Sequence, residues 1–276
     1  MFRVCERVVV LINDIEKIDN LIKKGVEFAN EHKKRLEVLF VHEAPTFSLP
    51  DYFFSSHSKK AKLDRDRVES KIKEDIHKID SGIKTLLFIV EGTTLDTVLS
   101  HAKGSTEILF ITSYEKKTTQ KLLKKTPYSY LILKNSSFTH HNILMPVELD
   151  DSTKDDIKLI KDIFPKSSIE IVHDYRYRIP YTEVDIVPVV SHLDREIHQE
   201  TRANERDIFE SYKKEFNIQG DFIEEKESLN IDLLNYIESR ETDLIVIHHQ
   251  EELMFSPSVT FNLLDKVSSN FLILNR

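Results

Sequence analysis

Cysteine and glycine are scarce in this chain, with one cysteine and five glycines among 276 residues. A single cysteine, Cys5, excludes an internal disulfide framework and a cysteine-rich zinc site, and we interpret it as a buried apolar residue rather than a nucleophile. The sequence also lacks an apolar run of roughly 18 residues, so it predicts no membrane-spanning helix. The N-terminus has no signal-peptide pattern, and we therefore expect a cytoplasmic protein.

Basic residues are outnumbered by acidic ones. The 39 lysines and arginines against 47 aspartates and glutamates give a net charge of −8. This balance argues against nucleic acid or an anionic membrane surface as the main partner. The 40% hydrophobic and 31% charged content is ordinary for a soluble globular protein, and the length allows one or two domains.

Local catalytic signatures are also missing. The chain contains no Walker loop, no Gly-x-Gly-x-x-Gly, no His-Glu-x-x-His and no Gly-x-Ser-x-Gly. We therefore expect a protein that is not an enzyme, with weak ATP hydrolysis left open.

Short apolar runs alternate with amphipathic helical segments along the whole chain. The strands predicted for the first half are 8–12, 36–41, 86–90, 107–111 and 130–133. Those of the second half are 143–147, 169–172, 222–224, 243–247 and 271–274. The predicted helices include 15–32, 59–80, 192–216, 231–237 and 258–269, with one helical turn around 122–123.

The element order restarts after the fifth strand, at an offset of about 135 to 140 residues. Residues 1–135 and 142–276 therefore predict two domains, joined by a polar linker at 136–141. Alternating strands and helices predict a parallel sheet with helices on both faces, and ligands bind such a sheet at the carboxyl ends of its strands. Thr93 or Thr94 can cap one helix, and Ser152–Asp155 has the form of a capping box.

An ordered set of segments resembles one family. The segments are Ile143-Leu-Met-Pro-Val-Glu148 followed by Ser152, Leu39-Phe-Val-His42, Ile171-Val-His173, Val90-Glu-Gly92, Asp243-Leu-Ile-Val-Ile247 and Ser258-Val-Thr260. In this order and spacing they are similar to the universal stress proteins in their tandem two-domain form. The resemblance covers nearly all of both halves.

The resemblance implies two α/β domains, each a flavodoxin-like, five-stranded parallel sheet with strand order 3-2-1-4-5. It also implies that strands 130–133 and 271–274 pair within the chain, with a homodimer as a further expectation. The implied role is stress adaptation through binding.

The ATP-binding branch of that family carries a glycine-rich loop after its fourth strand, Gly-x2-Gly-x9-Gly-Ser/Thr. Glycines let the backbone approach phosphates, and the next helix N-terminus offers free N–H groups. Here the loop begins with residues 248–251, His-His-Gln-Glu, and Pro257 stands at the last glycine position. Neither half has a glycine in this loop. We therefore expect a chain that needs no cofactor, with ATP or AMP as possible ligands.

The resemblance also gives positions where a ligand would make contact. In the second half they are Glu148, Val172, His173, His248, His249, Ser258, Val259 and Thr260, and in the first half Asn13, Thr112 and Thr119. Two interpretations of the hydroxyl groups stay open, since they can cap helices or contact a phosphate.

Histidines give a second candidate site. His173 and His248 follow strands of the second half and are expected near Glu148, and histidine with carboxylate is a plausible zinc or nickel set. Their spacing follows from the fold, however, and matches no local ligand motif.

We therefore expect a tandem stress protein that acts by binding proteins or ligands without the family's usual ATP site. The alternatives are an adenine-nucleotide-binding regulator with its site in the second half, a metal-responsive module, and a flavodoxin-like enzyme. The missing phosphate loops weaken the last of these.

Overall fold

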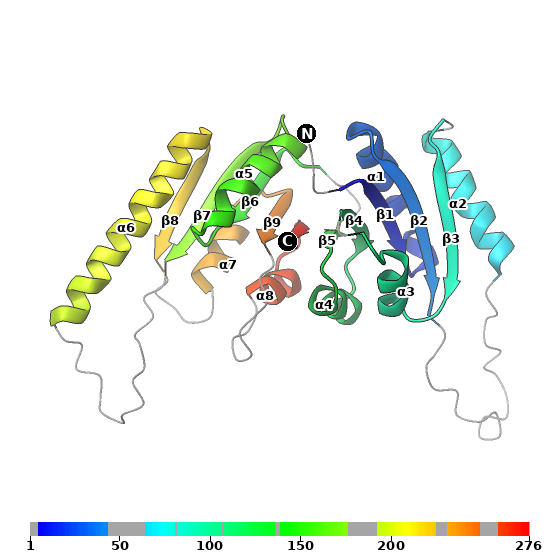
Figure 1. The fold of residues 1–276 in the computed structure, drawn as a ribbon. Coiled ribbons are helices and arrows are strands. Elements are labelled where there is room, and N and C mark those ends of the chain that lie inside the picture. The colour runs from blue at the N-terminus through cyan, green and yellow to red at the C-terminus, as the bar shows by residue number, and fades with distance from the viewer. Residues whose placement is uncertain are drawn as a thin grey trace, which may run out of the picture. The chain divides into compact units, whose positions relative to one another are not determined.

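A computed structural model describes residues 5–43, 64–80, 82–105, 107–135, 139–175, 192–224, 231–248 and 259–275. By their contacts the described residues form two compact units (Figure 1). The first contains residues up to 135 together with 270–275, and the second contains 139–248 and 259–269. None of the helices in these ranges is both long and apolar enough to cross a membrane.

The first unit is a sheet with helices on both faces. Its elements are β1 (Arg7–Ile12), the 3-10 turn η1 (Ile15–Lys17), α1 (Ile18–Glu31), β2 (Arg35–His42), α2 (Arg65–Ile79), β3 (Thr85–Glu91), α3 (Thr94–His101), β4 (Ile108–Ser113), α4 (Lys116–Lys125), β5 (Ser129–Leu133) and β10 (Asn270–Leu274). The strand order is β3-β2-β1-β4-β5-β10, parallel from β3 to β5. The expected order 3-2-1-4-5 is therefore confirmed for this half.

The sequence of β1 explains its central place. Val8 to Ile12 are all buried, and such a continuous apolar run suits a strand that is covered on both faces. α1 packs with α2 on one face of the sheet, and α3 packs with α4 on the other (Figure 1). α1 turns Leu21, Ile22 and Val26 inward at helical spacing.

The second unit repeats this arrangement. Its elements are β6 (Asn142–Pro146), α5 (Asp151–Ile163), β7 (Ser168–Tyr175), α6 (His192–Phe216), β8 (Gln219–Glu224), α7 (Ile231–Glu238), β9 (Leu244–His248) and α8 (Val259–Lys266). Its strands run in the order β9-β6-β7-β8, all parallel. α5 packs beside α6, and α6 lies against β7 and β8.

β10 is the last strand of the second sequence repeat, but it groups with the first unit. It pairs antiparallel with β5, with Phe271 opposite Ile132 and Ile273 opposite Tyr130. The Asn270 side chain is 2% exposed and accepts hydrogen bonds from the backbone N–H groups of Lys134 and Asn135, at 2.9 and 3.2 Å. Backbone pairing therefore sets the unit boundary here, and not the repeat.

Two predicted elements needed correction. The helical turn expected around 122–123 is part of a full helix, α4, which begins at Lys116. Its sequence is rich in lysine and its apolar face is narrow, since Leu122 and Leu123 supply most of it. The strand expected at 169–172 extends to Tyr175 because its last residues pair with β8.

Gly220 sits where β8 approaches β7 closely. A Cβ atom at this position would lie 2.3 Å from the backbone oxygen of Ile171, which cannot move aside without breaking the pairing. We predict that Gly220→Ala lowers the free energy of unfolding by about 1–3 kcal/mol, the usual cost of overpacking. Gly82→Ala is the matched control, because its nearest neighbour would be a side-chain oxygen at 3.4 Å. Equal urea midpoints for the two variants would contradict this account.

Cys5 is 1% exposed, and its thiol donates to the backbone oxygen of Arg7 at 3.0 Å. Burial raises the pKa of the Cys5 thiol to about 11. We predict slow alkylation of the folded protein by iodoacetamide at pH 8, where roughly one thiol in a thousand is ionised. Unfolding in urea exposes the thiol and should raise the rate of labelling by about tenfold or more. Equal rates in both states would refute the buried assignment.

Candidate functional site

The carboxyl ends of the parallel strands are the natural place for a ligand in this fold. In the first unit β1 lies between β2 and β4, so the chain moves to one side after β1 and returns on the other side before β4. The loops that follow β1 and β4 diverge at this point. β6 has the same position between β7 and β9 in the second unit.

A side-chain hydrogen bond spans this point in the first unit. Asn13 follows β1, and its amide Nδ2 donates to Glu115 Oε2 at 2.7 Å. Glu115 follows β4 and is the N-cap residue of α4, so its carboxylate lies at the start of a helix. A helix start is the position where this fold would otherwise receive an anion, because free N–H groups and the helix dipole favour negative charge there.

The two threonines predicted as ligand contacts in the first unit are both buried. Thr119 is 3% exposed, and its hydroxyl accepts a hydrogen bond from the backbone N–H of Glu115 at 3.1 Å. This bond satisfies one of the free donors at the start of α4, as the capping interpretation expected. Thr112 lies within β4 and is 5% exposed.

In the second unit Asp150 organises the loop after β6. Its Oδ1 accepts hydrogen bonds from the Thr153 backbone N–H at 3.0 Å and from the hydroxyls of Ser152 and Thr153 at 2.7 and 3.1 Å. The capping box expected at Ser152–Asp155 is therefore wrong by two positions, because α5 begins at Asp151 and Asp150 is its cap. Leu149, just before it, has a φ of 60°, an uncommon conformation for a residue with a side chain.

His173 lies near the end of β7, two residues before Tyr175, and is 5% exposed. Its Nδ1 lies 2.7 Å from the backbone oxygen of Val147, and its Nε2 lies 3.0 Å from Glu205 Oε2. A carbonyl oxygen can only accept, so Nδ1 carries a proton and donates it. Glu205 belongs to α6, and the pair therefore holds α6 against the sheet.

His248 ends β9 and has a different carboxylate partner. Its Nδ1 lies 2.8 Å from Asp156 Oδ2, and Asp156 is 4% exposed within α5. Glu148, the acid expected beside both histidines, has an exposed side chain. Within the described ranges no three His, Cys, Asp or Glu side chains gather as a metal-binding group. The structure therefore does not bring His173, His248 and Glu148 together as a ligand set.

The remaining predicted positions fall into two groups. His249 and Ser258 lie outside the described residues. Val172 is buried in β7, Val259 is the first residue of α8, and Thr260 in that helix is 7% exposed.

Sequence reasoning missed Glu115, Asp156 and Glu205, the three acids that bind the predicted residues. Glu115 could have been noticed as an acid directly before a helix, close after a strand. Asp156 and Glu205 carry no such local signal, because they lie 92 and 32 residues from the histidines that they contact. Only the packing of α5 and α6 on the sheet brings them there.

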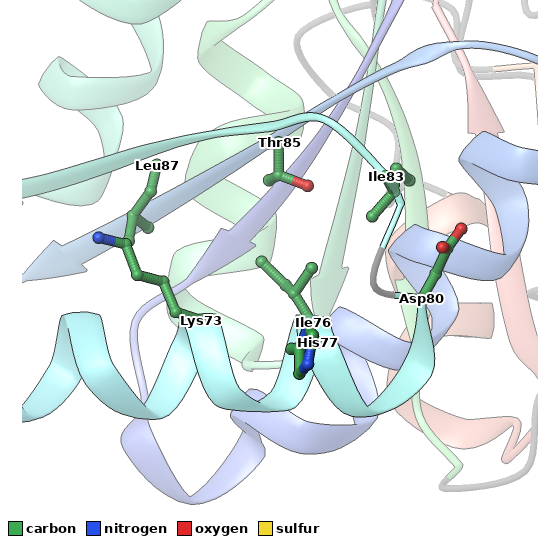
Figure 2. A pocket seen from close by; sticks show the side chains of 7 residues that line it. All are labelled: Lys73, Ile76, His77, Asp80, Ile83, Thr85 and Leu87. Carbon is green, nitrogen blue, oxygen red and sulfur yellow. The ribbon is translucent and has the colours of Figure 1, made fainter.

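A cavity of about 220 Å³ lies in another part of the first unit, between α2 and β3 (Figure 2). The residues that line it are Lys73, Ile76, His77, Asp80, Ile83, Thr85 and Leu87. Thr85 is the first residue of β3, so this cavity lies toward the amino end of the strand and away from the carboxyl edge.

The Asp150 cap gives a stability test of the second unit. Partial burial would raise the pKa of Asp150, but its hydrogen bonds to Ser152 and Thr153 outweigh that effect and hold the pKa below its ordinary value. We predict that Asp150→Ala costs about 1 kcal/mol at pH 7, as loss of an N-cap usually does.

This deficit should depend on pH. A carboxylate whose pKa is lowered on folding stabilises above its ordinary value of 3.8, and that contribution is lost as the pH falls through the lower folded value. The difference between variant and wild type should therefore shrink in acid. Asp162→Ala, an exposed acid in the last turn of the same helix, is the control. A deficit that stays constant down to low pH would contradict this role.

Comparison with known proteins gives fold relatives at low sequence identity. No protein-family model and no curated protein matches the chain. A functionally unknown protein from Pseudomonas aeruginosa PAO1 superposes with a TM-score of 0.66 at 13% identity, over 99% of this chain and 93% of that one.

Two further solved structures carry a family description. A protein from Pseudomonas aeruginosa UCBPP-PA14, described as a candidate universal stress protein, has a TM-score of 0.66 at 14% identity, over 99% of this chain and 94% of that one. A universal stress protein from Archaeoglobus fulgidus has a TM-score of 0.58 at 14% identity, over 97% and 98%. Along almost its whole length, this chain has the α/β fold of solved universal stress proteins.

Proposed function

We propose that this chain is a stress-response protein of the universal stress type, which acts by binding a partner or ligand rather than by catalysis. The whole-length fold similarity to solved universal stress proteins supports the general role. The proposal further holds that the chain works without the ATP site of that family's nucleotide-binding branch.

The bond between Asn13 and Glu115 is the observation that carries this second part. The amide that follows β1 is committed to a carboxylate that follows β4, at 2.7 Å. The same carboxylate places a negative charge at the start of α4, where the phosphates of a nucleotide would have to lie. This charge opposes the binding of a triphosphate, and it argues against an ATP site in the first unit.

Equilibrium dialysis with radiolabelled ATP, ADP and AMP, with and without Mg²⁺, tests the proposal. We predict no saturable binding of nucleotide to the wild type below about millimolar concentration. This limit corresponds to a binding free energy weaker than about −4 kcal/mol. Glu115→Ala removes the repelling charge and should strengthen any residual ATP binding by roughly tenfold. Glu107→Ala removes an equal charge at the opposite end of β4 and should leave it unchanged.

The alternative of a nucleotide-binding regulator is decided by the same assay. Micromolar ATP affinity of the wild type would overturn the proposal. If Ser258→Ala or Thr260→Ala then abolished that binding, the site would belong to the second half. If Glu115→Ala weakened it, Glu115 would be a ligand contact and not a barrier.

A further inference from the structure

β3 is the terminal strand of the sheet in the first unit. Among the strands that the structure describes, it pairs with β2 alone. A terminal strand presents a row of backbone N–H and C=O groups that another strand can extend. Two observations show which residues of β3 direct these groups away from β2.

The backbone N–H of Gly92 donates to the His42 oxygen at 3.1 Å, so Gly92 faces β2. The backbone oxygen of Ile89 accepts instead from Arg65 Nη2 of α2, at 2.7 Å. Because backbone groups alternate in direction along a strand, Thr85, Leu87, Ile89 and Glu91 direct theirs outward. The Ile89 oxygen keeps a second lone pair, so the bond to Arg65 does not exhaust it.

The two faces of β3 differ. Thr85 and Leu87 turn their side chains toward α2 and line the cavity (Figure 2). The Thr85 hydroxyl is buried and has no hydrogen-bond partner among the described residues. On the opposite face Leu86 and Phe88 are 42% and 37% exposed, unusual values for large apolar side chains in a strand.

From these features we propose that β3 pairs antiparallel with β3 of a second copy of this chain, about a two-fold axis through Phe88. A strand that meets its own copy around a two-fold axis is self-complementary only when residues of the same face stand opposite each other. Centring the axis on Phe88 meets this condition. It places Leu87 opposite Ile89 of the second copy, so that their outward backbone groups bond.

The same register accounts for the exposed apolar face. Phe88 stands opposite Phe88 of the second copy, and Leu86 stands opposite Val90. Opposed side chains in such pairs have Cβ atoms about 5 Å apart, so the aromatic and aliphatic surfaces cover each other. The edge-to-face contact between Phe88 and His101, with ring centroids 4.7 Å apart, holds the aromatic ring at this face.

Charge complementarity favours a second copy over an unrelated strand. Thr85 stands opposite Glu91 of the second copy, on the face that carries α2. The exposed Glu91 carboxylate of the second copy then reaches the rim of the cavity that Thr85 lines. Lys73 and His77 also line this rim. Lys73 is ion-paired with Glu69, but an ammonium group has three donors and can serve both acids. Asp80 also lines the cavity, but its carboxylate already accepts hydrogen bonds from the Gly82 N–H and the Asn30 side-chain amide.

Sedimentation velocity of the full chain, from low to high micromolar concentration, tests this interface, which is independent of the function proposed above. We expect a concentration-dependent dimer. Glu91→Lys places a second cation beside Lys73 of the other copy and should raise the dimer dissociation constant by roughly tenfold or more. Lys73→Glu places a second acid beside Glu91 of the other copy and should weaken the dimer to a similar extent. The double variant restores an opposite pair and should return to within about threefold of the wild type.

The double variant separates an interface defect from a folding defect, because a second destabilising change would not restore the dimer. Phe88→Arg should abolish dimerisation. Ile15→Arg, at a side chain 41% exposed in the same unit but away from β3, should not. A wild type that is monomeric throughout, a dimer insensitive to Phe88→Arg, or a double variant as weak as the single ones would each overturn the proposal.

Discussion

The pairing of β1 with a parallel strand on each side is the constraint on which the first unit depends. Val8 to Ile12 are buried on both faces, so the strand must be central and helices must cover it from both sides. A central first strand forces the chain to leave on one side and return on the other. At that reversal the loops that follow β1 and β4 diverge, beside Asn13. β6 imposes the same geometry on the second unit.

Acidic side chains occupy the edges that this geometry creates. Glu115 lies at the start of α4 and Asp150 at the start of α5, so each helix begins with a carboxylate of its own chain. At α5 the Asp150 carboxylate accepts directly from a helix N–H, whereas at α4 the Glu115 carboxylate accepts from Asn13 and makes no cap hydrogen bond. His173 and His248 are likewise held by Glu205 and Asp156. The edge residues thus serve the attachment of helices to the sheet.

The fifth strand of each repeat and the third strand of the first repeat have different surroundings. β10 corresponds to β5 in the repeat, and the two pair with each other antiparallel within the first unit. The buried Asn270 side chain fixes this pairing, because it satisfies two backbone N–H groups that follow β5. β3, in contrast, has one partner strand among the described residues and carries its apolar side chains on an exposed face. The neighbouring strands, and not the strand sequence alone, therefore decide which apolar side chains are covered.

The sequence by itself determined the elements and their order. Apolar runs such as 8–12 and 243–247 and the helical spacing of α1 report burial directly, since side-chain chemistry and period are local properties. The cap at Thr93 was equally local, and its hydroxyl accepts from the Asp96 N–H at 3.2 Å. The family resemblance supplied the strand order, which local patterns do not contain.

Only the tertiary structure decided which side chains meet at the strand ends. Asn13 and Glu115 are 102 residues apart, and His248 and Asp156 are 92 apart. No periodicity encodes such distances, because they depend on how helices cross the sheet. The expected group of His173, His248 and Glu148 followed from strand positions. In the structure His173 contacts Glu205 of α6, and His248 contacts Asp156 of α5. A polar side chain that loses water on folding needs a hydrogen-bond partner, and the tertiary structure decides which partner lies within reach.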